Sequence, residues 1–189
     1  METGRVIPFS RLPVPLHQRR QTDRLCLRPP SEDDATAHLA LFAHPLVVRH
    51  RPDPTPLGPA ASAAKLARDM AHWQAHGFGR WAVRRRLDGE IIGFGGVTWP
   101  EDDHGFDRAL NLSYHVHPAF WGRGYATELA RTTVRFAFDG LAASHVIGLA
   151  RAWNRASARV LEHTGMVFQR EIEFGGAPSL LYAITRPSG

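Results

Sequence analysis

The feature that most constrains the fold is a strand, a glycine-rich turn, a helix and a second strand in succession. The first strand is "ALNLSYHVH" (Ala109–His117) and the turn is "WGRGYA" (Trp121–Ala126). A helix follows from about Gly124 to Phe138, and "HVIGLARA" is the second strand. A helix that connects two strands of one sheet normally leaves them parallel. We therefore expect these two strands to be parallel neighbours.

Hydrophobic periodicity and turn residues predict the other elements. A first strand is expected in Thr22–Pro30 and a helix from Ser31 that Pro45 ends. The further elements are a helix closed by Gly77, two strands around Asp88-Gly89, a helix from Asn154 to Gly165, and two strands joined across Gly175-Gly176. This order predicts an α/β (α+β) fold with one mixed, mostly antiparallel sheet of about seven strands. Helices are expected on both faces of the sheet.

Length and composition bound the class of protein. The 189 residues predict one folded domain, residues 21–189, behind a flexible N-terminal arm of residues 1–20. A single cysteine, Cys26, excludes an intramolecular disulfide, so we expect a cytoplasmic protein. No apolar run approaches the roughly 20 residues of a membrane helix. The net charge is +5, and all but one of the 23 basic residues are arginine. The arginines are scattered and no nucleic-acid-binding motif accompanies them.

The glycine-rich turn has the physical properties of an anion-binding site. Amides at a helix N-terminus have no partner within the helix, and the helix dipole places positive charge there. Gly122 and Gly124 let a phosphate approach the backbone, Ala126 keeps the first turn small, and Arg123 can add a charge. The turn therefore predicts a diphosphate-binding helix start. A tight structural turn is the alternative.

A second motif supports the first. "NRASARVLEHTGM" begins at Asn154 and has Ser157 three residues later. With "LSYHVHPAFWGRGYATE" before it, this segment resembles the GNAT superfamily of acetyl-CoA-dependent N-acetyltransferases. The first stretch is similar to the family's Q/R-x-x-G-x-G/A turn, with Trp121 in the first position. The N-x-x-S segment resembles the ribosomal-protein-alanine (RimJ/RimL-like) branch. The resemblance extends from about residue 21 to the end.

The resemblance implies where acetyl-CoA would bind. The amides from Gly122 to Thr127 would hold its pyrophosphate; these residues are Gly122, Arg123, Gly124, Tyr125, Ala126 and Thr127. Main-chain groups of Tyr114, His115 and Val116 would pair with the pantetheine arm at a bulge, where the parallel strands splay apart. An amide near Val116 would stabilise the oxyanion.

The resemblance also implies roles for the second motif. Asn154 would hydrogen-bond the pantetheine arm, and Ser157 would protonate the departing thiolate. An equally ordinary role for Asn154 is the N-cap of its helix, with Ser157 in the first turn. Some related enzymes have a glutamate base and a tyrosine acid where this chain has Leu149 and Leu161, so those roles cannot be transferred.

The general base has several candidates. Our first choice is Glu101, in the acidic loop "PEDDHGFDR", because a carboxylate can take the proton of an ammonium group. A solvated loop is the alternative. The other candidates are Asp102, Asp103, His104, His115, His117, Glu171 and Glu173.

The predicted function is transfer of acetyl from acetyl-CoA to a primary amine by direct attack in a ternary complex. The acceptor is a protein N-terminus or a small-molecule amine, and the acidic loop would suit a cationic one. We expect no metal, because no histidine pair has zinc-site spacing. The alternative is a non-catalytic acyl-CoA-binding or RNA/ribosome-docking module. Free edge strands at the C-terminus would allow a homodimer.

Overall fold

Eight strands form one sheet in the order β1-β2-β3-β4-β5-β6-β8-β7. The computed structural model describes residues 19–102 and 104–187, so nearly all of the predicted arm lies outside the described residues. The strands are β1 (Arg20–Gln21), β2 (Leu25–Arg28), β3 (Arg80–Arg85), β4 (Ile91–Thr98), β5 (Ala109–Val116), β6 (His145–Arg151), β7 (Val167–Phe174) and β8 (Ala177–Thr185).

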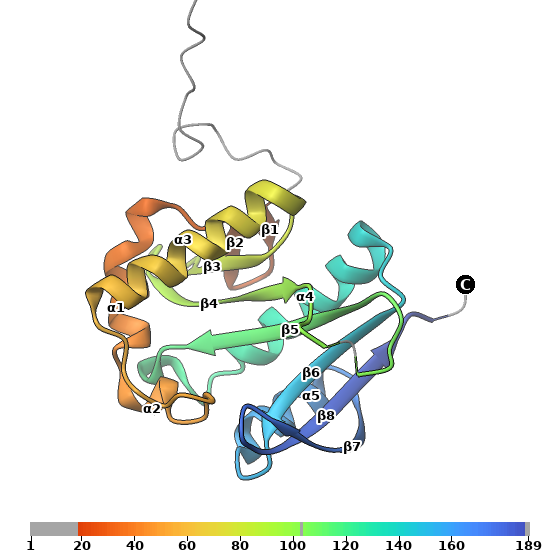
Figure 1. Ribbon diagram of the computed structural model, residues 1–189. Coiled ribbons are helices and arrows are strands. Elements are labelled where there is room, and N and C mark those ends of the chain that lie inside the picture. Colours follow the sequence, from red (N-terminus) through yellow and green to blue (C-terminus); the bar gives the residue numbers. More distant parts are fainter. Residues whose placement is uncertain (1–18, 103, 188–189) are drawn as a thin grey trace, which may run out of the picture.

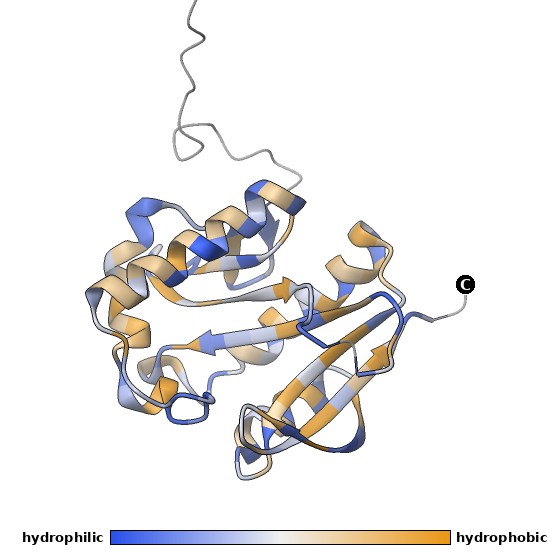
Figure 2. Ribbon diagram, viewed as in Figure 1, coloured by the Kyte–Doolittle hydropathy of each residue, from blue (hydrophilic) through white to orange (hydrophobic). Residues whose placement is uncertain are grey.

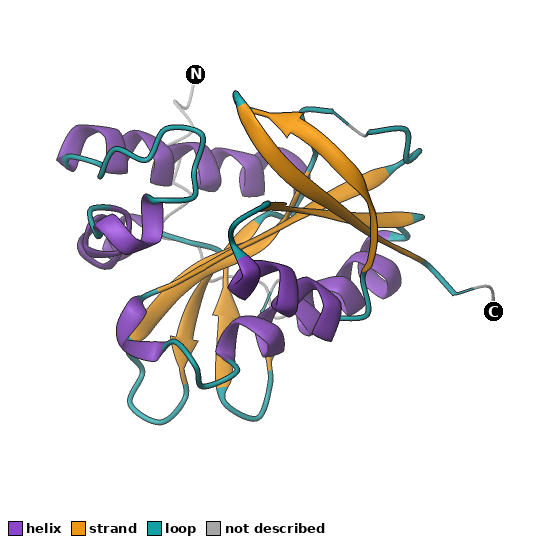
Figure 3. Cartoon of the chain, turned by 90° about the horizontal axis from the view of Figure 1, so that it is seen from below, coloured by secondary structure: helices purple, strands orange, loops and turns teal. Residues whose placement is uncertain are grey.

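Helices cover both faces of this sheet, as the sequence predicts (Figures 1 and 3). One face carries α1 (Ala35–Phe42), α2 (Pro45–Val48) and α3 (Pro59–His76), and the other carries α4 (Tyr125–Leu141) and α5 (Arg155–His163). Short 3-10 helices span Glu32–Asp34 and Pro118–Phe120. Helix α3 presents hydrophobic and hydrophilic residues in alternation along its length (Figure 2), as expected for a helix with one buried side.

The prediction that Pro45 ends a helix is wrong in detail. Helix α1 already ends at Phe42, and Pro45 is the first residue of α2. Proline is tolerated at a helix start because its missing N–H would have no helical partner there. The side chain of His44 caps this start by accepting a hydrogen bond from the amide of Leu46.

Among the described residues the only parallel strand pair is β5 with β6, which confirms the expected βαβ unit. Their pairing runs from Ala109 opposite His145 to Leu112 opposite Gly148. Beyond Leu112 the two strands continue without pairing, so they part at their carboxyl ends.

The bulge expected in β5 is not present. The pairing of β4 with β5 keeps one register from Thr98 opposite Asn111 to Gly93 opposite Val116. The gap therefore arises because β6 diverges from β5, while β5 stays regularly bonded to β4.

Alternate residues of β5 face different layers. Leu110 and Leu112 are buried in the cluster that includes Leu129 of α4, and Tyr114 packs against the same cluster. His115 faces the other layer, where its ring lies 5.0 Å from that of Phe42. The gap beside β5 is thus bordered by side chains from both faces of the sheet.

Candidate functional site

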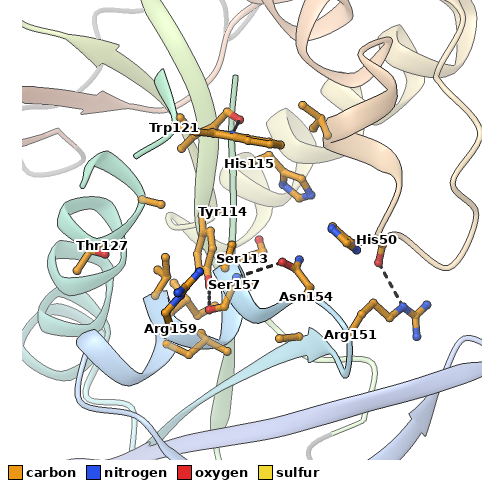
Figure 4. Close-up of a pocket in the computed structure, with 18 of the residues that line it drawn as sticks. His50, Ser113, Tyr114, His115, Trp121, Thr127, Arg151, Asn154, Ser157 and Arg159 are labelled. Carbon is orange, nitrogen blue, oxygen red and sulfur yellow. Dashed lines mark hydrogen bonds between the residues drawn. The ribbon is translucent and has the colours of Figure 1, made fainter. Parts of the chain in front are cut away.

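A cavity of about 620 Å³ lies where β5 and β6 part. It is lined by β5 from Asn111, the end of β6, the turn before α4 and its first residues, α5, α2 with the chain that follows it, and Phe174 at the end of β7. In Figure 4, Thr127 and Arg159 lie at one end and His50 and Arg151 at the other, with Tyr114, Ser157 and Asn154 between them.

The glycine-rich turn opens into this cavity. Gly122 and Gly124 have φ angles of 73° and 78°, a region that side chains disfavour, and Gly124 is the N-cap of α4. A Cβ atom on Gly122 would meet nothing within 4 Å, so space lies in front of its backbone. Both glycines line the cavity with Tyr125, Ala126 and Thr127. Main-chain groups and room for an anion therefore coincide at this helix start.

The turn is held from outside by a residue that the sequence did not single out. Arg24 donates to the carbonyl oxygen of Arg123 at 2.8 Å and pairs with Glu128 of α4 at 2.5 Å. Arg123 itself does not line the cavity; its guanidinium lies 5.9 Å from the ring centre of Phe120. The sequence offers one signal for this role: Arg24 is a basic residue directly before the first buried residue of β2.

The backbone of β5 presents alternate residues to the gap. The amide of His117 bonds the Ile92 carbonyl of β4 at 2.8 Å. Antiparallel alternation then directs the main chain of His115 toward β4, and that of Tyr114 and Val116 toward the gap. The Val116 carbonyl accepts a 2.6 Å hydrogen bond from the indole of Trp121. The prediction that His115 offers main-chain groups to a ligand is therefore wrong, because those groups point to β4.

Three side chains meet between the two ends of the cavity. The Ser157 and Tyr114 hydroxyls are 2.9 Å apart, and the Tyr114 hydroxyl lies 3.0 Å from the Ser157 carbonyl oxygen. Burial raises the pKa of Tyr114, so the phenol stays protonated. Asn154 is the N-cap of α5 and accepts from the Ser157 amide at 3.1 Å, which confirms the capping alternative. The contact of Tyr114 with Ser157 was missed, because it joins residues 43 apart in the sequence.

Comparison with known proteins identifies the family. Residues 24–167 match the model of the acetyltransferase (GNAT) domain, which is most of the chain. The chain belongs to the GNAT acetyltransferase family. It is 29% identical over 151 residues to the uncharacterized N-acetyltransferase YoaA of Bacillus subtilis, covering 80% of this chain and 82% of that one.

Solved structures share the fold of this acetyltransferase. An acetyltransferase from Agrobacterium tumefaciens superposes with a TM-score of 0.76 at 24% identity, covering 93% of this chain and 96% of that one. The ribosomal-protein-S5-alanine acetyltransferase from Vibrio fischeri gives a TM-score of 0.69 at 18% identity, covering 89% and 96%. Family membership makes this chain an acetyl-CoA-dependent acyltransferase.

The acetyltransferase does not bring Glu101 to the cavity. The loop that contains it precedes β5, whereas the cavity is lined by residues 111–116 of that strand, and Glu101 is not among the lining residues. The other candidates also lie away from the cavity, except His115: Asp102, His104, His117, Glu171 and Glu173 do not line it, and Asp103 lies outside the described residues.

The end of the acetyltransferase cavity opposite α4 is rich in positive charge. Arg49, His50, Arg51 and Arg151 line it, and within residues 19–102 and 104–187 no aspartate or glutamate lines any part of the cavity. Burial lowers the pKa of His50, and the charges of Arg49 and Arg151 lower it further. The expectation of an acidic surround for a cationic acceptor is thus not met at this cavity.

The side chain of His115 also lies near positive charges, of which Arg51 is one. Burial, together with the charges of Lys65, Arg80 and Arg51, lowers its pKa to about 3. Asp69 lies nearby, but its two oxygens pair with Lys65 at 3.0 Å and Arg80 at 2.9 Å. His115 is therefore neutral at physiological pH.

Metal-binding clusters and membrane-spanning helices are both absent from the described part of the chain. Residues 19–102 and 104–187 contain no group of three or more histidine, cysteine, aspartate or glutamate side chains placed to hold a metal ion. Within the same residues, every helix is too short or too polar to cross a bilayer.

Proposed function

We propose that this enzyme transfers acetyl from acetyl-CoA to a primary amine by direct attack within a ternary complex. The observation that carries the proposal is one cavity that joins an anion-binding helix start, an unpaired strand end and a fixed hydroxyl pair. The first two are what the diphosphate and the amide-containing arm of coenzyme A need.

The donor would be held largely by the main chain. Amides of Gly122 to Thr127 would bind the diphosphate, with Gly124, Tyr125, Ala126 and Thr127 at the cavity. Tyr114 would offer its amide and carbonyl to the pantetheine arm, because both face the gap beside β5. Asn154 has already committed its carbonyl oxygen to the Ser157 amide, so its side-chain NH₂ is the group left for the arm.

Oxyanion stabilisation falls to Val116. Its amide faces the gap, and the peptide group that carries this amide also contains the His115 carbonyl, which faces β4 in the regular ladder, so the peptide plane is held in place before substrate binds. A fixed donor of this kind is typically worth about 3–4 kcal/mol in an acyl-transfer transition state.

Ser157 is the proposed hydrogen donor to the sulfur. The Tyr114 hydroxyl can donate its hydrogen to the Ser157 hydroxyl oxygen, which orients Ser157 and leaves its single hydroxyl hydrogen free for the sulfur. Tyr114 is thus a positioning residue, and the raised pKa of its phenol keeps it from ionising during turnover.

The overall reaction forms a C–N bond and breaks the C–S bond of the thioester that acetyl-CoA supplies. An ammonium substrate loses two protons: one to solvent before attack, and one that balances the thiol of the released coenzyme. No carboxylate in the part of the chain that the structure describes lines the cavity, so in this proposal the first proton leaves through water rather than to Glu101. An α-amine, whose pKa is about 8, releases it more readily than a lysine side chain, whose pKa is about 10.4.

Two similarities bear on which kind of amine is the acceptor. The RimJ/RimL-like motifs and the similarity to a ribosomal-protein-alanine acetyltransferase at 18% identity favour an α-amino group as the acceptor.

The test combines binding and turnover. Titration calorimetry with coenzyme A is expected to give saturable binding, and acetyl-CoA consumption is expected to rise when amines from a chemically diverse panel are added. Binding without transfer to any amine would overturn the catalytic proposal. Absence of binding would overturn the assigned donor site.

A further inference from the structure

We propose that the acceptor amine carries an anionic group, a carboxylate or a phosphate, and that Arg51, His50 and Arg151 bind it. This inference rests on the proposed function, because it describes the second substrate of the same cavity. It replaces the cationic acceptor that the acidic loop suggested.

The position of these residues separates them from the donor site. His50 and Arg51 follow α2, and Arg151 ends β6. Figure 4 places His50 and Arg151 across the Tyr114–Ser157 pair from Thr127 of α4. The helix start at Thr127 and the end of the cavity that carries His50 and Arg151 therefore bind different parts of the substrates. An anion bound at this second end belongs to the acceptor, which approaches the thioester from that side.

Arg151 is a buried cation without a counterion. Its side chain is 5% exposed. Its hydrogen-bond partners are neutral: the His50 carbonyl at 3.2 Å, the Ala177 carbonyl at 3.1 Å, the Ser179 hydroxyl at 3.0 Å and the Phe174 carbonyl. No ion pair among the described residues involves it. A buried charge without an opposite charge is costly, and a bound anion would offset that cost.

Two further donors at this end are buried and have no hydrogen-bond partner among the described residues. One is the Nη1 group of Arg51. The other belongs to His50, whose Nε2 accepts a 2.9 Å hydrogen bond from Arg49. In a neutral imidazole whose Nε2 accepts, the proton is on Nδ1. This buried Nδ1 is therefore a donor available to a ligand, like Nη1 of Arg51.

The chemistry of these groups determines which kind of ligand they can bind. Two guanidinium groups and an imidazole N–H offer donors only, and the lowered pKa of His50 keeps its ring neutral. Carboxylates and phosphates accept several such bonds at once, and arginine binds both in planar, paired geometry. An ammonium group would instead meet Arg49, Arg51 and Arg151 with no carboxylate on the cavity wall. The positive end thus favours the anionic part of the acceptor and leaves its amine to point toward Ser157.

Matched acceptor pairs test this preference. Initial rates of acetyl transfer are measured with L-glutamate against L-glutamate diamide, L-alanine against L-alaninamide, and glucosamine 6-phosphate against glucosamine. We expect kcat/KM to be at least tenfold higher for the anionic member of at least one pair. Preference within the amino acid pairs identifies a carboxylate, and preference within the sugar pair identifies a phosphate.

A variant connects the preference to the structure. Arg51→Gln is expected to raise the KM of the preferred anionic acceptor at least tenfold, to leave its neutral counterpart within twofold, and to leave the dissociation constant of acetyl-CoA unchanged. Arg68→Gln, on the exposed side of α3, is the matched control and should alter none of these values. Thermal unfolding of both variants checks that they fold.

The outcomes separate the two proposals. Transfer that is equal or faster with the neutral member of every pair overturns the anionic acceptor while leaving the acetyltransferase proposal intact. An unchanged anionic preference in Arg51→Gln overturns the assigned role of Arg51. Binding of acetyl-CoA without transfer to any amine overturns the proposed function, and this inference falls with it.

Discussion

The Tyr114–Ser157 contact allows a test of individual hydroxyl groups. Ser157→Ala is expected to lower kcat about 100-fold, the lower range for a proton donor in the transition state. Tyr114→Phe is expected to cost about tenfold, equivalent to one hydrogen bond of about 1.4 kcal/mol. Steady-state kinetics and calorimetry should show that acetyl-CoA affinity is unchanged in both.

The matched control is Tyr182→Phe, since Tyr182 bonds Glu162 at 3.0 Å and does not line the cavity. Its kcat should be that of the wild type. If Tyr114 acts through Ser157, the double variant loses no more than Ser157→Ala alone. Additive losses would contradict this positioning role.

A buried histidine gives the molecule a defined sensitivity to acid. His38 is 0% exposed and bonds Ser62 at 2.7 Å; burial lowers its pKa to about 4. Below about pH 6.5 the unfolded chain binds a proton at this position that the folded protein does not. The free energy of unfolding should therefore fall by about 1.4 kcal/mol per pH unit from this group between pH 6 and pH 4.

Urea denaturation at several pH values checks this expectation. His38→Gln keeps a hydrogen-bonding side chain and should flatten the slope, whereas His163→Gln, on the exposed surface of α5, should leave it unchanged. An unaltered slope in His38→Gln would assign the acid sensitivity to other groups.

At the scale of elements, the start of α4 can be tested with two glycines of the same conformation. Gly122 has φ 73° and Gly77, the C-cap of α3, has φ 71°; a Cβ atom at either would meet nothing within 4 Å. Alanine at each position should cost a similar amount, about 1–2 kcal/mol. Only Gly122→Ala is expected to weaken coenzyme A binding, by tenfold or more, because its methyl group would occupy the space of the diphosphate.

Calorimetry and denaturant unfolding of both variants measure the two effects separately. Equal coenzyme A affinity in Gly122→Ala and Gly77→Ala would remove the glycine-rich turn from the donor site.

The sequence predicts the elements that depend on neighbouring residues, and it does not predict contacts between residues far apart in the chain. The parallel pair and the start of α4 follow from local signals: a connecting helix and two glycines with positive φ. The contact of Tyr114 with Ser157 depends instead on how α5 packs against β5, which no local pattern encodes. The acidic loop predicts a base at Glu101 because carboxylates cluster there, but Glu101 does not line the cavity. The arginine end was missed because its members lie about 100 residues apart in the sequence.

At the scale of the whole molecule, donor binding should stabilise the fold. Coenzyme A at 100 times its dissociation constant adds about 2.7 kcal/mol to the free energy of unfolding. For a domain of this length the unfolding midpoint should rise by about 5–10 °C. Differential scanning fluorimetry measures the shift, with adenosine as a control that lacks the diphosphate. A rise with adenosine equal to that with coenzyme A would show that the helix start contributes nothing.

Association between copies remains a prediction at this scale. Strand β7 is an edge of the sheet, and it exposes Val167 at 63% and Phe168 at 48%. Such an edge can pair with another strand, which supports the expected homodimer. Sedimentation at several concentrations determines the oligomeric state.

The link between Arg24 and Glu128 has a consequence for biosynthesis. Two residues that leave the ribosome more than 100 positions apart meet beside the turn that we propose binds the donor. Prematurely terminated chains that end before this turn contain Arg24 but neither the turn nor Glu128, so the proposed donor site cannot form in them. It can form only after the start of α4 has emerged from the ribosome.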